Sequence, residues 1–417
     1  MILDLHKNCI MIFERNAKNT IIDVSKTFPV VLVSGPRQVG KSTLLNSIAD
    51  KSRKIVSLDN PSIRALAKTD PELFLQRYSP PVLIDEVQYA PELFPFIKII
   101  VDERKRPGDF WLTGSQMFKL MKNVTESLAG RVGIVPLLGL SNSEICNNNF
   151  DEFEVNPDKL IRRLDCAKRM DINEVFERIF KGSFPHLYEV ENVNLNIYFE
   201  SYLETYLNRD VRELEQVGNE TAFLKFIKVV AARTGTVLNY ETLAQETEIS
   251  SPTAKHWLSI LISSGIVTLV EPFSSNALKR VIKSPRMYFL DTGLCAYLMG
   301  WENPSVLENS SVSGEFFETW IVSEIVKSYL NRGKKPPLYY YRDSNKKEID
   351  LILYKNGIAY PIEIKKSANP VKPTKNFNAL DSIEADNKKV GTGAVICMAG
   401  DVFPLDRNNW YVPAWII

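Results

Sequence analysis

Five short apolar runs interrupt the first 136 residues, and the segments between them place apolar residues at helical spacing. Runs of four or five apolar residues bounded by turn-forming residues are typical of buried strands. The runs cover residues 29–33, 55–58, 81–84, 109–112 and 132–135. Strands that alternate with helices usually pair in parallel. We therefore predict an α/β domain over residues 1–145 with a five-stranded, mostly parallel sheet.

The pattern changes after residue 145. Residues 146–235 begin with a polar stretch, break at Gly182–Pro185 and continue with helical periodicity over 198–214, which predicts a helical linker region. Residues 236–300 then offer two helices, joined by a turn with a proline at the start of the second, and an apolar strand over 266–270. This order resembles a winged-helix domain. Its second helix exposes one dependable cation, Lys255, so DNA binding and a protein-packing role both stay open.

Residues 301–417 return to a mixed α/β pattern. An amphipathic helix over 314–322 precedes a strand at 338–341, and two further strands flank Asn356-Gly357. An Asn-Gly pair between two apolar runs is a strong signal for a hairpin turn. We expect the apolar runs at 393–397 and 410–412 to complete this sheet.

Charge and cysteine content narrow the function classes. The 417 residues include 51 Lys and Arg against 50 Asp and Glu, a net charge of +1, so any basic surface must be local. The five cysteines are scattered and lack Cys-x-x-Cys spacing, which argues against a disulfide framework and a zinc site. No apolar run approaches the roughly 18 residues of a membrane helix, and the N-terminus lacks a secretory layout. We expect a cytoplasmic protein without a membrane partner.

The first candidate site is a G-x-x-x-x-G-K-[ST] motif that directly follows the strand at 29–33. A P-loop needs this context, because its backbone N–H groups surround phosphate oxygens at the start of a helix. Lys41 is expected to reach the β- and γ-phosphates of ATP, and the Ser42 hydroxyl is expected to join the Mg²⁺ shell. The predicted nucleotide-binding residues are Gly35, Pro36, Arg37, Gln38, Val39, Gly40, Lys41, Ser42 and Thr43.

Two carboxylates end the strand at 81–84. Asp85 is expected to hold Mg²⁺, directly or through water, and Glu86 to orient and deprotonate the water that attacks the γ-phosphate. The alternative is a solvated strand end at which Asp85 caps the next turn. Thr113 and Ser115 follow another strand, so they either sense the γ-phosphate or satisfy a turn. Arg131 is either an arginine finger or a surface ion-pair partner.

A second set of chemical groups lies in the C-terminal region. Asp350 starts one hairpin strand, and Glu363 and Lys365 lie two apart, on one face of the other strand. Together with Glu318 on the preceding helix, these acids suit Mg²⁺, and Lys365 can position a water or stabilise developing charge. The pattern resembles the PD-(D/E)xK nuclease fold, which is also known as a restriction-endonuclease-like domain, although Ile349 stands where that motif has proline. The alternative is a strand pair whose charges face solvent and pair with each other.

Local charge around these acids favours a polyanion. Residues 327–375 contain twelve Lys and Arg against four Asp and Glu, an excess of eight. Such a patch raises association with nucleic acid.

Four segments together resemble a family of prokaryotic AAA-type ATPases. They are Gly-Pro-Arg-Gln-Val-Gly-Lys at 35–41, Leu-Ile-Asp-Glu-Val-Gln at 83–88, Leu-Thr-Gly-Ser at 112–115 and Ser-Leu-Ala-Gly-Arg at 127–131. The resemblance covers nearly the whole chain, with a C-terminal part like the domain of unknown function DUF4143. It implies a P-loop NTPase parallel sheet of the AAA superfamily, for which ring or dimer assembly is usual, and it implies no known substrate.

The sequence thus favours an ATP-hydrolysing protein whose nucleotide state repositions a winged-helix and nuclease-like module, acting on DNA rather than RNA. The alternative is a nucleotide switch that hydrolyses slowly, carries an inactive nuclease-like domain and holds a protein partner. A P-loop kinase is a third reading, although Glu86 suits activation of a water better than of an acceptor hydroxyl.

Overall fold

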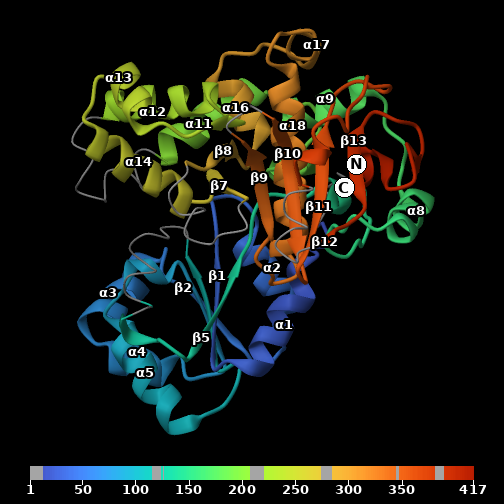
Figure 1. Ribbon diagram of the computed structural model, residues 1–417. Coiled ribbons are helices and arrows are strands. Elements are labelled where there is room, and N and C mark those ends of the chain that lie inside the picture. Colours follow the sequence, from blue (N-terminus) through green and yellow to red (C-terminus); the bar gives the residue numbers. More distant parts are fainter. Residues whose placement is uncertain are drawn as a thin grey trace, which may run out of the picture.

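The computed structural model describes residues 13–114, 124, 126–206, 220–273, 284–343, 347–380 and 389–417. The described chain builds two sheets, one of five strands and one of ten. Figure 1 shows the first sheet with its helices in the lower half and the second sheet in the upper half, with a group of helices beside it.

The first sheet is parallel throughout and has the order β2-β3-β4-β1-β5. This confirms the five strands expected from the sequence. The carboxyl ends of β1, β3 and β4 lie at one edge, because parallel strands share a direction. The strands are β1 (Val30–Ser34), β2 (Lys54–Ser57), β3 (Val82–Asp85), β4 (Phe110–Gly114) and β5 (Val132–Pro136).

Helices cover both faces of this sheet, which explains why β1 is apolar at successive positions. Val31 and Val33 pack in the same core as Ala17 and Ile21 of α1, whereas Val30 and Leu32 belong to the core that contains residues of α4 and α5. Figure 1 shows α1 and α2 on one side and α3, α4 and α5 on the other. The helices are α1 (Ala17–Thr27), α2 (Lys41–Ile48), α3 (Pro61–Thr69), α4 (Pro71–Arg77) and α5 (Leu93–Arg104), with a 3₁₀ turn, η1, at Val87–Tyr89.

The middle of the chain is largely helical, and side-chain caps define several of its helices. Ser250 caps α14 by accepting a bond from the N–H of Thr253, and Pro252 occupies the first turn, where its missing N–H costs nothing. The polar stretch after residue 146 contains a helix, α8. The helices are α7 (Asn142–Ile145), α8 (Pro157–Cys166), α9 (Ile172–Lys181), α10 (His186–Glu189), α11 (Leu195–Tyr206), α12 (Glu220–Ala232), α13 (Tyr240–Thr247), α14 (Ser251–Ser263), α16 (Thr292–Leu298) and α17 (Pro304–Glu308).

The second sheet combines strands from the middle and the end of the chain. The hairpin β10–β11 is antiparallel, and its turn residues Asn356 and Gly357 both have positive φ, 53° and 79°, as the Asn-Gly signal predicts. Helix α18 (Ser313–Leu330) packs against β8 and β11. The strands are β6 (Thr236–Val237), β7 (Val267–Pro272), β8 (Arg286–Phe289), β9 (Leu338–Arg342), β10 (Glu348–Lys355), β11 (Ile358–Ile364), β12 (Lys389–Val390), β13 (Gly393–Cys397), β14 (Phe403–Pro404) and β15 (Asn409–Pro413), with 3₁₀ turns η4 (Phe377–Leu380) and η5 (Ala414–Ile416).

The expected boundary between residues 300 and 301 falls inside this continuous sheet. Strand β7 pairs in parallel with β9, and the N–H of Phe273 donates to the carbonyl oxygen of Tyr340 over 2.6 Å. One hydrophobic core also extends from Val33 of β1 to Ile417. The three C-terminal segments therefore pack as one body on the first domain.

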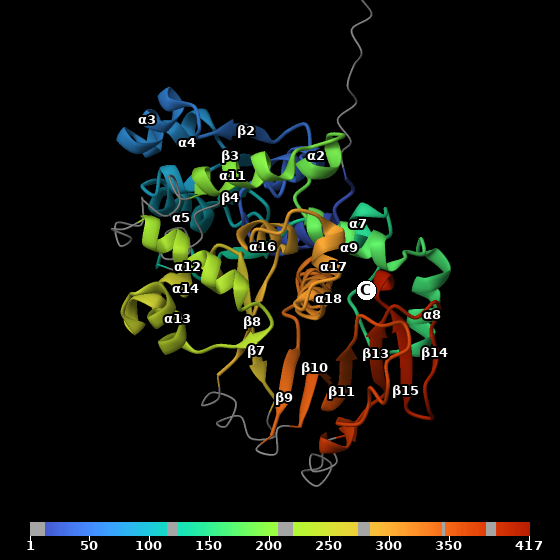
Figure 2. The same cartoon turned by 90° about the horizontal axis from the view of Figure 1, so that it is seen from above.

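The helical region also reaches the first sheet. Figure 2 shows α11 on the side of the first sheet where α2 begins. There the hydroxyl of Tyr198 donates to Oε1 of Gln38 over 2.7 Å. At the end of α14, a Cβ added at Gly265 would lie 3.1 Å from the ring of Pro36.

Among the described helices, none is long and apolar enough to cross a membrane. In the same part of the chain, Cys146, Cys166, Cys295 and Cys397 form no disulfide.

Candidate functional site

The loop between β1 and α2 has the tight backbone that its glycines allow. Gly35 has a φ of 148°, and a Cβ at this position would lie 1.9 Å from the carbonyl oxygen of Leu137. Gly40, directly before α2, has a φ of 86°. Both conformations are rare for residues with a Cβ. The glycines thus let the loop turn back over the start of the helix.

Lys41 lies inside this loop and is 6% exposed. Its ammonium donates to the carbonyl oxygens of Gly35 and Pro36 over 3.0 and 2.7 Å. The side chain therefore points back along the loop, within reach of the space that the loop encloses.

Asp85, at the end of β3, lies against the loop. Its Oδ1 accepts hydrogen bonds from the hydroxyl of Ser42, over 2.6 Å, and from the hydroxyl of Thr113. The N–H of Glu86 donates to Oγ1 of Thr113 over 3.1 Å, and the side-chain amide of Gln88 donates to the Glu86 carboxylate. Glu86 has a φ of 56°, which turns the chain immediately after the strand. The fold thus brings four predicted residues together from α2, β3 and β4.

A cavity of about 350 Å³ opens over this cluster. Arg37 to Thr43, apart from Val39, contribute to its walls, together with Glu86. Its lining residues are Arg37, Gln38, Gly40, Lys41, Ser42, Thr43, Asp59, Glu86, Tyr89 and Thr205.

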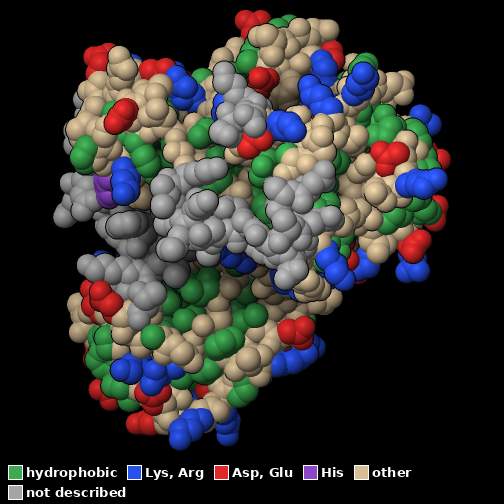
Figure 3. All heavy atoms as spheres, viewed as in Figure 1, with side chains coloured by type: hydrophobic (Ala, Val, Ile, Leu, Met, Phe, Trp, Pro, Cys, Tyr) green, Lys and Arg blue, Asp and Glu red, His purple; other side chains and the backbone are tan. Residues whose placement is uncertain are grey.

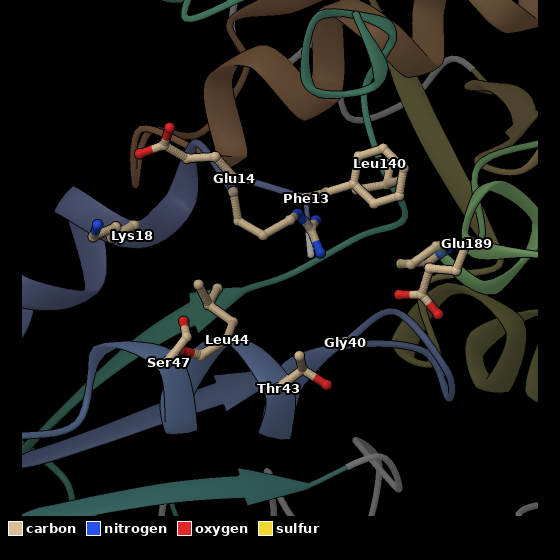
Figure 4. A pocket seen from close by; sticks show the side chains of 11 residues that line it. Phe13, Glu14, Lys18, Gly40, Thr43, Leu44, Ser47, Leu140 and Glu189 are labelled. Carbon is tan, nitrogen blue, oxygen red and sulfur yellow. The ribbon is translucent and has the colours of Figure 1, made fainter. Parts of the chain in front are cut away.

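A second cavity, of about 250 Å³, adjoins the start of α2 and shares Gly40 and Thr43 with the first. Figure 4 shows Thr43 and Leu44 on one side and Phe13 and Leu140 on the other. Its lining residues are Phe13, Glu14, Arg15, Lys18, Gly40, Thr43, Leu44, Ser47, Leu140, Pro185 and Glu189.

Sequence reasoning missed Arg15. Its side chain is 5% exposed, and Nη1 donates to the carbonyl oxygen of Val39, a residue of the loop, over 2.7 Å. Nη2 donates to the carbonyl oxygen of Leu138 over 2.8 Å, and Nε donates to Oε1 of Glu144 over 3.1 Å. A single arginine before a helix carries no periodic or motif signal, so nothing in the sequence marks it.

Two predicted residues lie apart from this cluster or outside the description. Arg131 precedes β5, at the edge of the sheet opposite the loop, and forms a two-bond ion pair with Asp102 over 2.6 and 2.9 Å. It therefore does not face the cavity. Ser115 lies outside the described residues.

The four acid-site residues of the C-terminal region also converge, and we call them the acid cluster: Glu318, Asp350, Glu363 and Lys365. The Lys365 ammonium lies 2.8 Å from Oε1 of Glu363 and 3.3 Å from Oδ2 of Asp350. The N–H of Ile364 donates to the same Oδ2 over 2.8 Å. Strands β10 and β11 supply three members, and α18 supplies Glu318.

Burial and mutual repulsion hold protons in this cluster near neutral pH. Burial first, and then the Asp350 carboxylate, raise the pKa of Glu318 to about 7, and the same two causes raise the pKa of Glu363 to about 7. Burial opposes the charge of Lys365, but Asp350 and Glu363 outweigh it and raise the pKa of this ammonium. Raised carboxyl pKa values of this kind are common at catalytic sites.

Two residues of β8 complete the surroundings of Glu318 and were not predicted. The hydroxyl of Tyr288 donates to Oε1 of Glu318 over 2.6 Å, and Nη1 of Arg286 donates to the same oxygen over 3.2 Å. Arg286 also pairs with Glu348 at the start of β10. These residues come from the middle of the chain, and no local pattern links them to Glu318.

The acid cluster is not a ready metal site. In the described residues, no group of three or more His, Cys, Asp or Glu side chains is arranged to hold a metal ion. The protein's own cations, Lys365 and Arg286, pair with the carboxylates instead. One feature favours a cation even so, because Oε2 of Glu363 is buried without a hydrogen-bond partner.

Ion pairs with acids outside residues 327–375 offset part of the expected basic patch. Five of the twelve Lys and Arg between residues 327 and 375 pair with acids outside that window. The pairs are Lys327 with Glu324, Arg332 with Asp151, Lys334 with Glu152, Lys355 with Glu152 and Glu154, and Lys366 with Glu308. On the face in Figure 3, Lys and Arg are interspersed with Asp and Glu. These pairs therefore offset five of the eight excess positive charges counted along the sequence.

Comparisons with known proteins agree with the first site. Residues 27–146 match the family described as an AAA domain. Residues 172–305 and 313–417 match two domains of unknown function, DUF8612 and DUF4143. Residues 27–146 are thus similar to an AAA domain, and the loop between β1 and α2 has the sequence and geometry of a P-loop.

Two relatives match nearly the whole chain. An uncharacterized protein of Mycobacterium tuberculosis and one of Mycobacterium bovis are each 28% identical over 410 residues, which is 98% of this chain and 85% of theirs. Among solved structures, the Walker-type ATPase paby2304 of Pyrococcus abyssi is similar over 69% of this chain and 96% of its own, with 15% identity and a TM-score of 0.42. The RuvB Holliday junction branch migration motor of Thermotoga maritima covers 61% of this chain and 88% of its own, with 15% identity and a TM-score of 0.29.

Proposed function

We propose that this protein binds ATP with Mg²⁺ at the loop between β1 and α2 and hydrolyses it. The observation that carries the proposal is that Lys41, Ser42 and Glu86 line one cavity. Asp85 and Thr113 bond to Ser42 and to the backbone of Glu86 beside it. This combination supplies a phosphate ligand, two oxygen donors for a divalent cation and a base.

Each residue has a task that its position supports. Lys41 would exchange its two carbonyl partners for phosphate oxygens, and the N–H groups at the start of α2 would add to the attraction. Ser42 and Asp85 fit a magnesium ion, since they place two hard oxygen donors side by side. When bound, this ion would neutralise charge on the phosphates. Glu86 would take the proton of the attacking water. The Thr113 hydroxyl would hold Glu86 in place by accepting a hydrogen bond from the Glu86 N–H.

The second cavity suits the nucleoside. It begins where the phosphate cavity ends, at Gly40 and Thr43, and Phe13, Leu44 and Leu140 give it an apolar lining. A flat purine ring needs such a surface, and a few polar groups at the rim fix its orientation.

Nucleotide affinity of Lys41→Ala tests the proposal. With fluorescent ATP and Mg²⁺ in solution, we expect this variant to lose at least about tenfold in affinity, because a charge-assisted phosphate contact contributes roughly 1.5–3 kcal/mol. Lys68→Ala is the matched control, since Lys68 is an exposed lysine of α3 in the same domain. Equal affinity in Lys41→Ala and Lys68→Ala would contradict the proposal.

A second candidate activity is metal-dependent cleavage of a phosphodiester at the acid cluster. The convergence of Glu318, Asp350, Glu363 and Lys365 favours it, as does the unpartnered oxygen of Glu363. DNA rather than RNA would be the substrate, in keeping with the order of β6, α13, α14, β7 and β8, which resembles a winged helix. Purified protein with Mn²⁺ should then cut DNA, and Asp350→Ala should not, whereas cleavage that survives in Asp350→Ala would contradict this activity.

The ion-paired lysines and arginines favour a different role for the C-terminal regions, which is to bind a protein partner. Binding to DNA depends on unpaired cations that displace counterions, and at least five of the cations expected to serve are already paired. Stimulation of the ATPase by DNA would contradict this alternative.

Self-association would give Arg131 a role. Its position at the far edge of the sheet permits contact with the nucleotide of a neighbouring subunit, as an arginine finger does. Light scattering with and without ATP would show the homo-oligomer that this role requires. A monomer under both conditions would contradict it.

A further inference from the structure

Residues 137–145 connect the nucleotide loop to helix α18, and we call them the connecting segment. They follow β5 and include α7. On one side the segment contacts the loop: the N–H of Leu137 donates to the carbonyl oxygen of Ser34 over 2.7 Å, and Gly35 lies directly against Leu137. The segment therefore cannot stay in place if the loop moves.

Arg15 ties the two together at a second point. Its guanidinium donates to Val39 of the loop and to Leu138 of the segment, and it pairs with Glu144 at the segment's far end. Glu144 is fully buried, and its other oxygen accepts from the N–H of Ser141 over 2.8 Å. Arg15 thus bonds to the loop backbone and to both ends of the connecting segment.

On its other side, the connecting segment bonds to α18. The ammonium of Lys327 donates to the carbonyl oxygen of Leu140 over 3.1 Å, and the N–H of Asn142 donates to Oε2 of Glu324 over 2.7 Å. Lys327 and Glu324 also pair with each other over 2.9 Å, and their side chains are 2% and 3% exposed. Glu318, of the acid cluster, lies on the same helix, about 9 Å from Glu324 along the helix axis, given a rise of about 1.5 Å per residue.

We infer that nucleotide binding at the loop shifts helix α18 through Arg15 and the connecting segment, so that the acid cluster responds to ATP. This inference rests on the proposed ATP binding and adds a regulatory link to it. The shift starts when the Lys41 ammonium binds phosphate and no longer donates to the carbonyl oxygens of Gly35 and Pro36. The loop backbone then moves, and Arg15 moves with it because its guanidinium donates to the carbonyl oxygen of Val39. Rigid, buried contacts pass such a displacement on, because packed interiors do not deform smoothly.

Amide hydrogen exchange of the full chain tests the link. The protein would be measured free, with Mg²⁺ and ADP, and with Mg²⁺ and the slowly hydrolysed analogue adenylyl imidodiphosphate. Peptides from 313–330 report on α18, and nucleotide binding would be measured in the same samples. We expect the analogue to change the exchange of the α18 amides by about fivefold or more, the lower end of usual coupling between sites.

The double variant Glu324→Met/Lys327→Met removes both hydrogen bonds between the connecting segment and α18 and leaves no unpaired buried charge. It should still bind the analogue at saturating concentration, while its α18 exchange stays as in the free protein. Glu315→Met is the matched control, since it makes the same change of glutamate to methionine at an exposed position of α18, and it should respond as the wild type does. Arg15→Lys keeps the charge but not the three-directional contact, and it provides a second test should the double variant fail to fold.

The outcomes separate the inference from the function beneath it. Bound analogue with unchanged exchange of α18 in the wild type would overturn the link and leave ATP binding intact. A normal response in the double variant or in Arg15→Lys would also overturn it. Absence of nucleotide binding to the wild type would overturn the proposed function and this inference together.

Discussion

The hydroxyl of Ser42 lies 2.6 Å from Oδ1 of Asp85, so the first turn of α2 is joined to the end of β3. The hydroxyl of Thr113 donates to the same oxygen from β4. Three neighbouring elements of the sheet edge thus meet at one carboxylate. Glu86 follows directly, and its backbone is held by Thr113.

Thr113→Val should slow ATP hydrolysis without weakening ATP binding. Valine has the shape of threonine but cannot accept the bond from the N–H of Glu86, and the loss of one such bond costs about 1–3 kcal/mol. We expect kcat to fall roughly 5- to 150-fold, with KM within about threefold of the wild type. Steady-state kinetics of Thr113→Ser, which keeps the hydroxyl, provide the control. A wild-type kcat in Thr113→Val would show that Thr113 has no part in positioning Glu86.

Gly35→Ala should destabilise the protein, because its Cβ has no room beside Leu137 and its φ of 148° disfavours a side chain. Backbone strain and overpacking together suggest a loss of about 2–5 kcal/mol in the free energy of unfolding. Gly314→Ala is the matched change. Gly314 lies in the first turn of α18, and an added Cβ meets no atom within 4 Å. Helix propensity predicts a gain there of roughly 0.5–1 kcal/mol. Thermal unfolding that ranks the two variants the other way would contradict this account of the loop.

Because of the acid cluster, the free energy of unfolding should fall as pH rises from about 4.5 to 7. The pKa of Glu318 and that of Glu363 are raised from 4.5 to about 7 in the folded protein, so the folded state binds protons more tightly than the unfolded state does. Their stabilising contribution is full below about pH 4.5 and is lost as pH rises toward 7. The slope reaches up to about 1.4 kcal/mol per pH unit for each carboxyl.

Urea unfolding between pH 4.5 and 8 measures this dependence. Glu363→Gln cannot titrate, so its stability should change less with pH than that of the wild type in this interval. Parallel curves for the two proteins would contradict the assignment of the raised pKa to Glu363. Glu308→Gln, which changes a carboxylate outside the cluster, is the control.

Removing one partner of the buried pair Glu324 and Lys327 should lower the free energy of unfolding more than replacing both partners with uncharged side chains. Lys327→Met leaves the Glu324 carboxylate buried without its cation, which costs about 3–5 kcal/mol in comparable pairs. The double variant Glu324→Gln/Lys327→Met removes both charges and keeps an oxygen that accepts from Asn142. We expect it to unfold at a higher temperature than Lys327→Met in scanning calorimetry. Additive losses in the double variant would show that the two residues act independently.

The sequence predicted the first domain well because its signals are local. Apolar runs such as 29–33 lie between helical segments, and the glycines of the loop determine its backbone whatever lies around it. The acid cluster was also predictable, since Glu363 and Lys365 share one face of a strand and an Asn-Gly turn fixes the hairpin that brings Asp350 beside them.

Long-range contacts were not predictable. Lys334 and Lys355 pair with Glu152 and Glu154, some 180 to 200 residues earlier, so a count of charges along the chain misjudged the surface. Arg15 and Arg286 owe their places to backbone carbonyls and carboxylates that only the fold assembles. The pairing of β7 with β9 likewise joins two segments that had the local patterns of separate domains.

Single-turnover hydrolysis by Glu86→Gln tests the central claim, ATP hydrolysis at this site, most directly. Protein in excess over radiolabelled ATP and Mg²⁺ would be followed for release of phosphate, beside Glu92→Gln, which makes the same change at an exposed residue ahead of α5. We expect Glu86→Gln to bind ATP as the wild type does and to hydrolyse it at least about 100-fold more slowly, the usual scale for loss of a general base, with Glu92→Gln unaffected. Hydrolysis by Glu86→Gln at the wild-type rate, with ATP bound, would contradict the account.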